Sequence, residues 1–176
     1  YMAEASKLRV SGYVGKPIKK ADIIEELEGL RNPVLPPKEN MLVAKCFGTF
    51  DVFVNGKSLA FERSKTKEML AYLIDRRGNA VTSGELRAIL WEGASSDKNT
   101  GLYLQKLKKD LITTLKNAGV EDVFITSRNK YAVNPELISC DYYDYLNNNP
   151  EGVRAYNGEY MSQYQWCRLQ NAISIK

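Results

Sequence analysis

The chain has 176 residues, of which 44% are apolar and 26% are charged, and its formal net charge is +4. This composition is typical of a globular protein, long enough for one domain with additions or for two small ones. It contains no run of about 18 apolar residues and no basic-then-apolar start, so we expect neither a membrane span nor a secretory signal.

The sequence offers few groups for catalysis. It contains no histidine, which removes Ser-His, Cys-His and His-metal chemistry. No glycine-rich phosphate loop or tight carboxylate pair takes their place, so we expect no enzyme, no cofactor and no small-molecule substrate. Cys46, Cys140 and Cys167 lie far apart and form no CxxC pair. This spacing argues against a zinc site or a disulfide framework and suits a reducing cytoplasm.

The positive charge is concentrated in the centre of the chain. Residues 41–135 hold 15 Lys and Arg against 10 Asp and Glu, whereas residues 136–176 hold 3 against 5. A polyanionic partner would therefore meet the central segment first.

The first segment, residues 1–31, combines a short β-rich run, LRVSGYVGKPI, with an amphipathic helix, ADIIEELEGLR. The helix places apolar residues at the spacing of one face: Ile23, Ile24, Leu27 and Leu30. Three prolines follow within residues 32–40. Proline lacks a backbone donor and stops helices, so we predict a linker there.

The motif GYVGKP, followed by an acidic amphipathic helix, resembles the C-terminal end of a response-regulator receiver domain. The resemblance implies that Lys16 contacts a phosphoryl group, that Tyr13 is a switch residue and that the bond before Pro17 is cis. The family's phosphoacceptor aspartate and first strands lie upstream of this motif, and one strand cannot form a parallel sheet. We therefore expect residues 1–31 to be a remnant of a receiver that cannot itself be phosphorylated; the alternative is a chance strand-turn-helix.

The second segment, residues 41–135, has the pattern of a compact α+β unit. The runs 42–50 and 51–61 are strand-like, and Asn55-Gly56 predicts a tight hairpin between them. A helix is expected over residues 64–77, ended by Gly78.

A capping box, Thr82-Ser-Gly-Glu85, predicts the start of a second helix that ends at Gly93. A polar loop then leads to a third helix, about 98–118. Residues 123–133 predict two short strands around a polar, cationic turn.

The third helix carries a leucine stripe at three- and four-residue spacing, which must be buried: Leu104, Leu107, Leu111 and Leu115. Lysines and a threonine fall elsewhere on the helix: Lys106, Lys109, Thr113 and Lys116. Tyr103 and Lys108 lie near the flanks. A solvated lysine face is the plain interpretation. The order helix, loop, helix and basic hairpin, however, is the layout of a winged helix-turn-helix, in which the second of these helices enters the major groove.

The segments ELRAILW (85–91) and YLQKLKKDL (103–111) resemble the OmpR-type winged-helix DNA-binding domain. RSKTKEMLAYLIDRRGNAVTSGEL further resembles the SARP-like bacterial regulators. The resemblance implies an α+β fold: a winged helix-turn-helix over residues 41–135 with an N-terminal antiparallel sheet and a C-terminal wing hairpin. A partial receiver segment (1–31) and a short helical tail (136–176) flank this domain.

The same resemblance implies the residues that meet DNA. Trp91, Lys98 and Asn99 would contact phosphates, and Tyr103 and Lys108 would contact the backbone on the flanks. Lys106 stands where the family often has a base-reading arginine. Secondary candidates for base edges are Gln105 and Thr100, and the wing would contribute Arg128, to the minor groove, and Lys130.

Three of these residues have plain alternatives: Trp91 filling the space between helices, Tyr103 as part of the core, and Arg128 as a solvated turn residue. The sequence also departs from the family. Lys106 offers a point charge in place of a forked guanidinium, Gly101 has no side chain, and the wing lacks the usual glycines. We expect backbone affinity to exceed sequence discrimination in a single copy, with specificity supplied by dimerisation or DNA shape.

The third segment, residues 136–176, contains six tyrosines and a tryptophan, which indicate a packing or contact surface. It resembles the start of the helical activation module of SARP-like regulators. The alternative is a C-terminal extension that completes the core.

Two functions fit these features. The first is a cytoplasmic bacterial transcriptional regulator of a two-component type, which binds double-stranded DNA as a homodimer and possesses a surface for RNA polymerase. The second is a winged-helix module that contacts polymerase or another regulator without strong DNA binding of its own.

Overall fold

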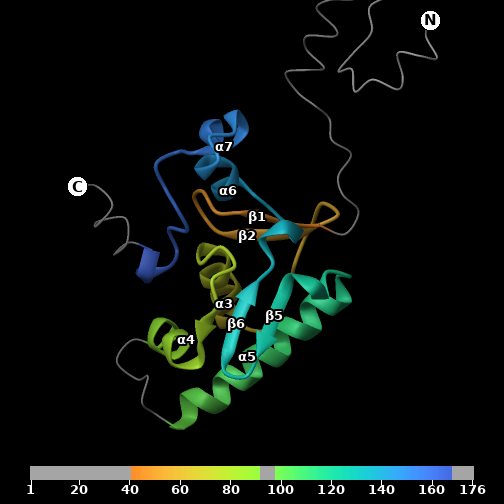
Figure 1. Ribbon diagram of the computed structural model, residues 1–176, viewed down its shortest axis with the longest axis vertical. Coiled ribbons are helices and arrows are strands. Elements are labelled where there is room, and N and C mark those ends of the chain that lie inside the picture. The colour runs from red at the N-terminus through yellow and green to blue at the C-terminus, as the bar shows by residue number, and fades with distance from the viewer. Residues whose placement is uncertain (1–40, 92–97, 168–176) are drawn as a thin grey trace, which may run out of the picture. The chain divides into compact units, whose positions relative to one another are not determined.

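A computed structural model of the chain describes residues 41–91 and 98–167. These residues begin with a sheet of four strands: β1 (Leu42–Lys45), β2 (Asp51–Val54), β3 (Lys57–Ser58) and, from far along the chain, β7 (Ile138–Cys140). The order is β3-β2-β1-β7 (Figure 1). β1 pairs antiparallel with β2 but parallel with β7. The expected antiparallel sheet is therefore a mixed one.

The tight turn at Asn55-Gly56 is confirmed, but its place is different from the expected one. Both residues have positive φ angles, 50° and 76°, as a two-residue hairpin requires. The turn joins β2 to β3, both within the second strand-like run. β1 is joined to β2 by residues 46–50, the end of the first strand-like run, where Gly48 has a φ of 74°.

Helix α3 (Ser64–Asp75) carries the apolar face that the sequence predicts. Met69, Leu70, Leu73 and Ile74 are all fully buried. The helix ends where Arg77 and Gly78 adopt positive φ angles of 52° and 83°. A Cβ on Gly78 would lie 3.1 Å from Pro135, so the position favours glycine for both its angle and its space.

Helix α4 (Ser83–Leu90) begins with half of the expected capping box. The Thr82 hydroxyl accepts the backbone N–H of Glu85 at 3.2 Å. The Glu85 carboxylate turns elsewhere and accepts the hydroxyl of Tyr72 on α3 at 2.9 Å. Burial, followed by this carboxylate, raises the pKa of Tyr72 to about 12. The glutamate thus ties α4 to α3.

Helix α5 (Lys98–Asn117) is packed against α3 and α4 by the expected leucine stripe. Leu104, Leu107, Leu111 and Leu115 are each no more than 1% exposed. Beside them the carboxylate of Asp110, also buried, accepts the hydroxyl of Thr66 on α3. The prediction for this helix is confirmed in both its bounds and its buried face.

The hairpin after α5 is formed by β5 (Phe124–Ser127) and β6 (Lys130–Val133), which follow the short 3-10 helix Glu121–Val123. β6 also pairs with β4 (Val81–Thr82), which leads directly into α4. The N–H of Ser83 donates to the carbonyl of Asn129 in the hairpin turn at 3.2 Å. The start of α4 and the hairpin tip are therefore held together.

The C-terminal part of the described chain contains the 3-10 helix Pro135–Leu137, β7, α6 (Asp141–Leu146) and α7 (Pro150–Ala155). The backbone of α6 comes so near to Gly152 that a Cβ there would lie 2.2 Å from the nitrogen of Tyr145. Beyond α7, four side chains return to the core: Met161, Tyr164, Trp166 and Cys167.

This part of the chain is not a separate module. Its described residues, which end at 167, belong to the same compact unit as α3, α4, α5 and both sheets. The boundary expected at residue 135 is thus corrected, because β7 fills a place in the first sheet. Residues 138–167 follow the alternative interpretation, an extension that completes the core.

Polar bonds fix this extension to the body. The Asp141 carboxylate accepts the backbone N–H groups of Cys46 and Phe47, at 2.8 and 3.2 Å. The side-chain amide of Gln163 bonds both the N–H and the carbonyl of Phe50. The hydroxyl of Tyr160 donates to the carboxylate of Asp75, at the end of α3, at 2.8 Å.

Within residues 41–91 and 98–167, no helix is both long enough and apolar enough to cross a bilayer.

Replacement of Leu111 by alanine should lower the free energy of unfolding by about 2–5 kcal/mol, because it removes a fully buried side chain from the stripe that holds α5. The matched control is Ile112→Ala on the same helix, where the side chain is 38% exposed and the loss should be much smaller. Urea denaturation of both variants measures the difference. Equal losses would contradict the described orientation of α5.

Tyr160→Phe should cost about 1–3 kcal/mol at neutral pH, because a half-buried carboxylate loses a donor. Burial raises the pKa of Asp75, and the Tyr160 hydroxyl acts against that rise by favouring the charged form. The cost should therefore be full above the pKa of Asp75 and shrink as the pH falls through it. Tyr156→Phe, at an exposed ring, is the control. Denaturation curves that show a cost independent of pH would contradict this role.

Candidate nucleic-acid interface

Opposite the leucine stripe, α5 presents a second stripe of side chains to solvent. Its members follow one another at spacings of three and four residues and, apart from the first and fourth, are lysines: Leu102, Lys106, Lys109, Thr113 and Lys116. All five are exposed. Because both stripes follow the 3.6-residue period, burial of the leucines forces these five side chains outward. They are called the outer stripe below.

The outer stripe is positively charged without compensation from its own helix. The one acid of α5, Asp110, is buried and engaged by the hydroxyls of Thr66 and Thr114. Lys106 extends its ammonium over the ring of Tyr103, 5.2 Å from the centroid, which keeps it on the surface. An anionic partner would thus meet lysines first.

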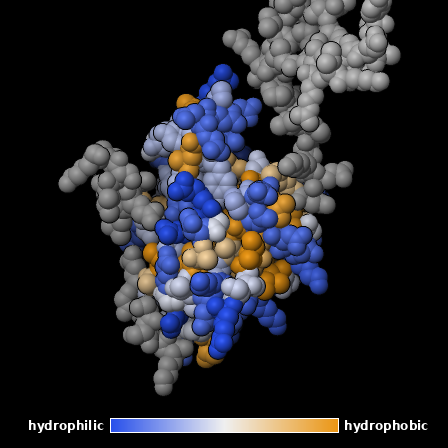
Figure 2. Space-filling model, in the orientation of Figure 1, coloured by the Kyte–Doolittle hydropathy of each residue, from blue (hydrophilic) through white to orange (hydrophobic). Residues whose placement is uncertain are grey.

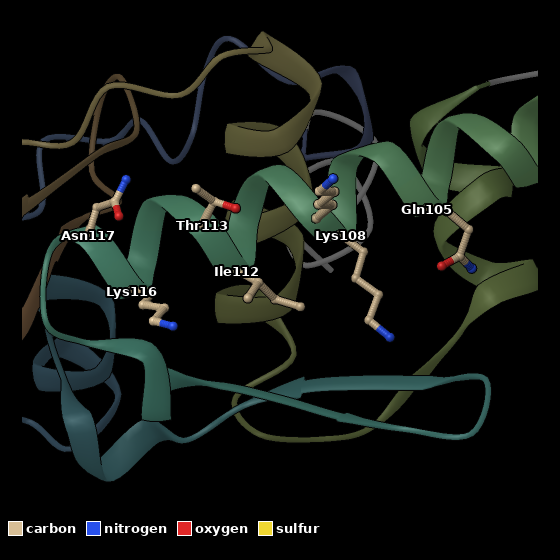
Figure 3. A pocket seen from close by; sticks show the side chains of 7 residues that line it. Gln105, Lys108, Ile112, Thr113, Lys116 and Asn117 are labelled. Carbon is tan, nitrogen blue, oxygen red and sulfur yellow. The ribbon is translucent and has the colours of Figure 1, made fainter.

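The flank of α5 beside the outer stripe faces the β5–β6 hairpin. Figure 3 shows Gln105, Lys108 and Ile112 extending toward the side along which the hairpin runs. The ammonium of Lys108 lies 5.8 Å from the ring centroid of Tyr131 on β6, and this lysine is half-buried. An open pocket follows this surface of α5, lined by Gln105, Lys108, Lys109, Ile112, Thr113, Lys116 and Asn117.

The hairpin itself adds two exposed cations, Arg128 in the turn and Lys130 at the start of β6. Asn129 beside them has a φ of 57°, a conformation that asparagine tolerates, so the turn needs no glycine. In the view of Figure 2 the surface is largely hydrophilic, with hydrophobic patches, one of them over the region of β5. Ile125, on β5, is 50% exposed.

Two aromatic candidates join α4 to α5. The ring of Trp91, just after α4, lies 6.5 Å from that of Tyr103. Trp91 is half-buried and packs against the core, in keeping with its plain alternative, although part of the ring remains at the surface. Tyr103 is 52% exposed, which argues against its being a core residue.

The N-terminal end of α5 requires one correction. Thr100, a candidate for base edges, is 5% exposed, because it falls on the buried side of the helix with Leu104 and Leu107. Asn99 is exposed. The side chain of Lys98 and the segment 92–97 lie outside the described residues, as do Tyr13, Lys16 and Pro17 of the receiver-like motif.

Sequence reasoning selected Lys106 but left the rest of the outer stripe out of the candidate site. Lys109, Thr113 and Lys116 are all exposed on the same face. The sequence does place these residues on one face, because they follow Leu102 by seven to fourteen positions at the helical period. They were not selected because the candidates were taken from the family pattern, which covers mainly the first half of the helix.

Among the described residues, potential metal ligands converge at Cys46, Cys140 and Asp141, whose ligand atoms lie within 4.8 Å of one another. The two sulfur atoms are 3.3 Å apart and buried. The hydrogen bond with Cys140, together with burial, raises the pKa of the Cys46 thiol far above its usual range. Asp141 already accepts three backbone N–H groups, including that of Tyr142. This cluster joins β1 to β7 and serves the fold.

No protein-family model and no curated protein match the sequence. Among solved structures, the chain is similar to Mycobacterium tuberculosis EmbR in complex with a low-affinity phosphopeptide, with a TM-score of 0.60 and 16% sequence identity. The similarity covers 77% of this chain and 42% of the EmbR chain, so this chain spans less than half of that length. The likeness is one of fold, a mixed α+β arrangement similar to EmbR's winged-helix fold.

The charge of the outer stripe can be tested with a polyanion of no particular sequence. The double variant Lys109→Glu and Lys116→Glu should elute from heparin at clearly lower salt than the double variant Lys45→Glu and Lys57→Glu. Both change the net charge equally, but only the first pair lies on the outer stripe. Equal elution would mean that net charge alone, and not this face, governs retention.

Proposed function

We propose that this chain is part of a bacterial transcriptional regulator whose winged-helix unit binds double-stranded DNA. Helix α5 lies in the major groove and the β5–β6 hairpin reaches the backbone or the minor groove. The observation that carries the proposal is the outer stripe: three exposed lysines on a helix whose one acid is buried. The likeness of fold to EmbR supports a regulator of the SARP type.

The surface favours phosphate contacts over base readout. Lysine contacts phosphate or guanine as a point charge, whereas arginine offers a planar fork. Lys106, Lys109 and Lys116 therefore supply affinity that depends little on sequence. Lys108 has a further role, because its position over Tyr131 lets it set the distance between helix and hairpin. Discrimination would then come from pairing of two copies on DNA, from DNA shape and from few base contacts.

The regulatory parts of the proposal rest on sequence resemblance. The motif of Tyr13, Lys16 and Pro17 favours control by a phosphorelay, and the absence of histidine and of a nucleophile-base pair favours a regulator over an enzyme. Cysteines kept as thiols suit a cytoplasmic protein. No cofactor or metal is needed for these roles.

A second function, protein contact, is favoured by a different surface. Four large apolar side chains of the α6–α7 region are between 37% and 49% exposed: Tyr145, Leu146, Val153 and Tyr156. Apolar exposure of this kind marks interaction surfaces. Another regulator or RNA polymerase would fit this surface, with or without DNA on the outer stripe.

A salt titration of duplex binding, followed by fluorescence polarisation, tests the proposal. With about five phosphate contacts, log K should fall with log salt at a slope of about −4 to −5. Lys106→Glu should weaken binding and flatten the slope, whereas Lys57→Glu on β3 should leave both unchanged. Binding that is absent at low salt, or insensitive to salt, would end the proposal in favour of the protein-contact function.

A further inference from the structure

The N-terminal end of the outer stripe holds an apolar side chain that the fold does not use. Leu102 is 67% exposed, the largest exposed fraction among the large hydrophobic side chains in the described part of the chain. Lys106 and Lys109 follow it on the same face, four and seven residues further along α5. An exposed leucine on a cationic face adds no charge and leaves apolar surface in contact with water. An apolar group on the partner would cover that surface.

Gln105, a polar neighbour of Leu102, adds a hydrogen-bonding group beside the apolar side chain. Gln105 is exposed and stands three positions after Leu102, a spacing that places two side chains next to each other on a helix, with Cβ atoms about 5–6 Å apart. Its amide offers both a donor and an acceptor. Leucine and glutamine together thus present one apolar surface and one bidentate hydrogen-bonding group.

This combination corresponds to one base pair in the major groove. An A·T pair presents the N7 acceptor and N6 donor of adenine beside the C5 methyl of thymine, whereas a G·C pair presents no methyl group. Glutamine pairs bidentately with adenine, and apolar side chains contact the thymine methyl. Lys106 and Lys109, further along the same face of α5, would hold the phosphates.

Building on the proposed function, we propose that α5 reads A·T pairs in the major groove, with Leu102 against a thymine methyl and Gln105 on an adenine edge. This assigns sequence discrimination to two uncharged residues and affinity to the lysines. The partner is therefore a duplex that contains an A·T pair in each site.

Removal of single methyl groups from the DNA tests this assignment. The full 176-residue chain first selects a duplex from a random 20-base-pair pool, and that duplex is then remade with deoxyuridine in place of thymidine. Wild-type protein should bind the uridine duplex roughly fourfold more weakly for each contacted methyl. Leu102→Ala should bind the two duplexes equally, while Ile125→Ala, an exposed apolar residue of the hairpin, should keep the preference.

The outcomes separate this inference from the proposed function. Salt-dependent binding with equal affinity for both duplexes, or a selected duplex of G·C pairs alone, would overturn A·T readout and leave DNA binding intact. No duplex binding at low salt would overturn both. A preference that persists in Leu102→Ala would assign the methyl contact to another residue and overturn the role of Leu102. Because Leu102 is exposed, the variant should fold, which its circular dichroism and melting temperature verify.

Discussion

The burial of one leucine stripe determines which face of α5 is exposed to solvent. Leu104, Leu107, Leu111 and Leu115 fix the rotation of α5 about its own axis, since each has left water almost completely. Burial of this kind contributes about 1.5–3 kcal/mol to stability for each side chain. A charge interaction of a surface lysine contributes less, about 0–1 kcal/mol, so the leucines decide the rotation. The rotation in turn decides that the lysines of α5 face outward together. The candidate interface is thus a consequence of core packing.

Buried polar groups make that rotation specific. Asp110 is placed on the buried side of α5 and satisfies its carboxylate with hydroxyls from α3 and from α5 itself. A rotated helix would leave this group without partners, at a cost of a few kcal/mol. Glu85 acts in a similar way between α4 and α3, through the Tyr72 hydroxyl. The three helices are therefore held in register by directional bonds as well as by apolar contact.

Sequence reasoning was accurate where periodicity and turn chemistry are local. The leucine period predicted α5, and the positive φ angles of Asn55 and Gly56 follow from the residue types. It failed where distant segments meet. Nothing in ISC (138–140) indicates that this strand pairs in parallel with β1, because the pairing depends on packing across nearly a hundred residues. For the candidate site, it selected Lys106 but missed Lys109, and it included Thr100, which helical phase places inside.

The parallel partnership of β1 and β7 also has a consequence for assembly of the chain. Leu42 pairs with Ile138, so the first sheet is completed only after the chain has been synthesised as far as β7. Closing so long a loop lowers the conformational entropy of the chain before the contacts between β1 and β7 can form, and this slows folding. Until then β1 offers an open row of backbone donors and acceptors to any extended segment nearby. Chains released before residue 140 would therefore be prone to aggregate through that edge.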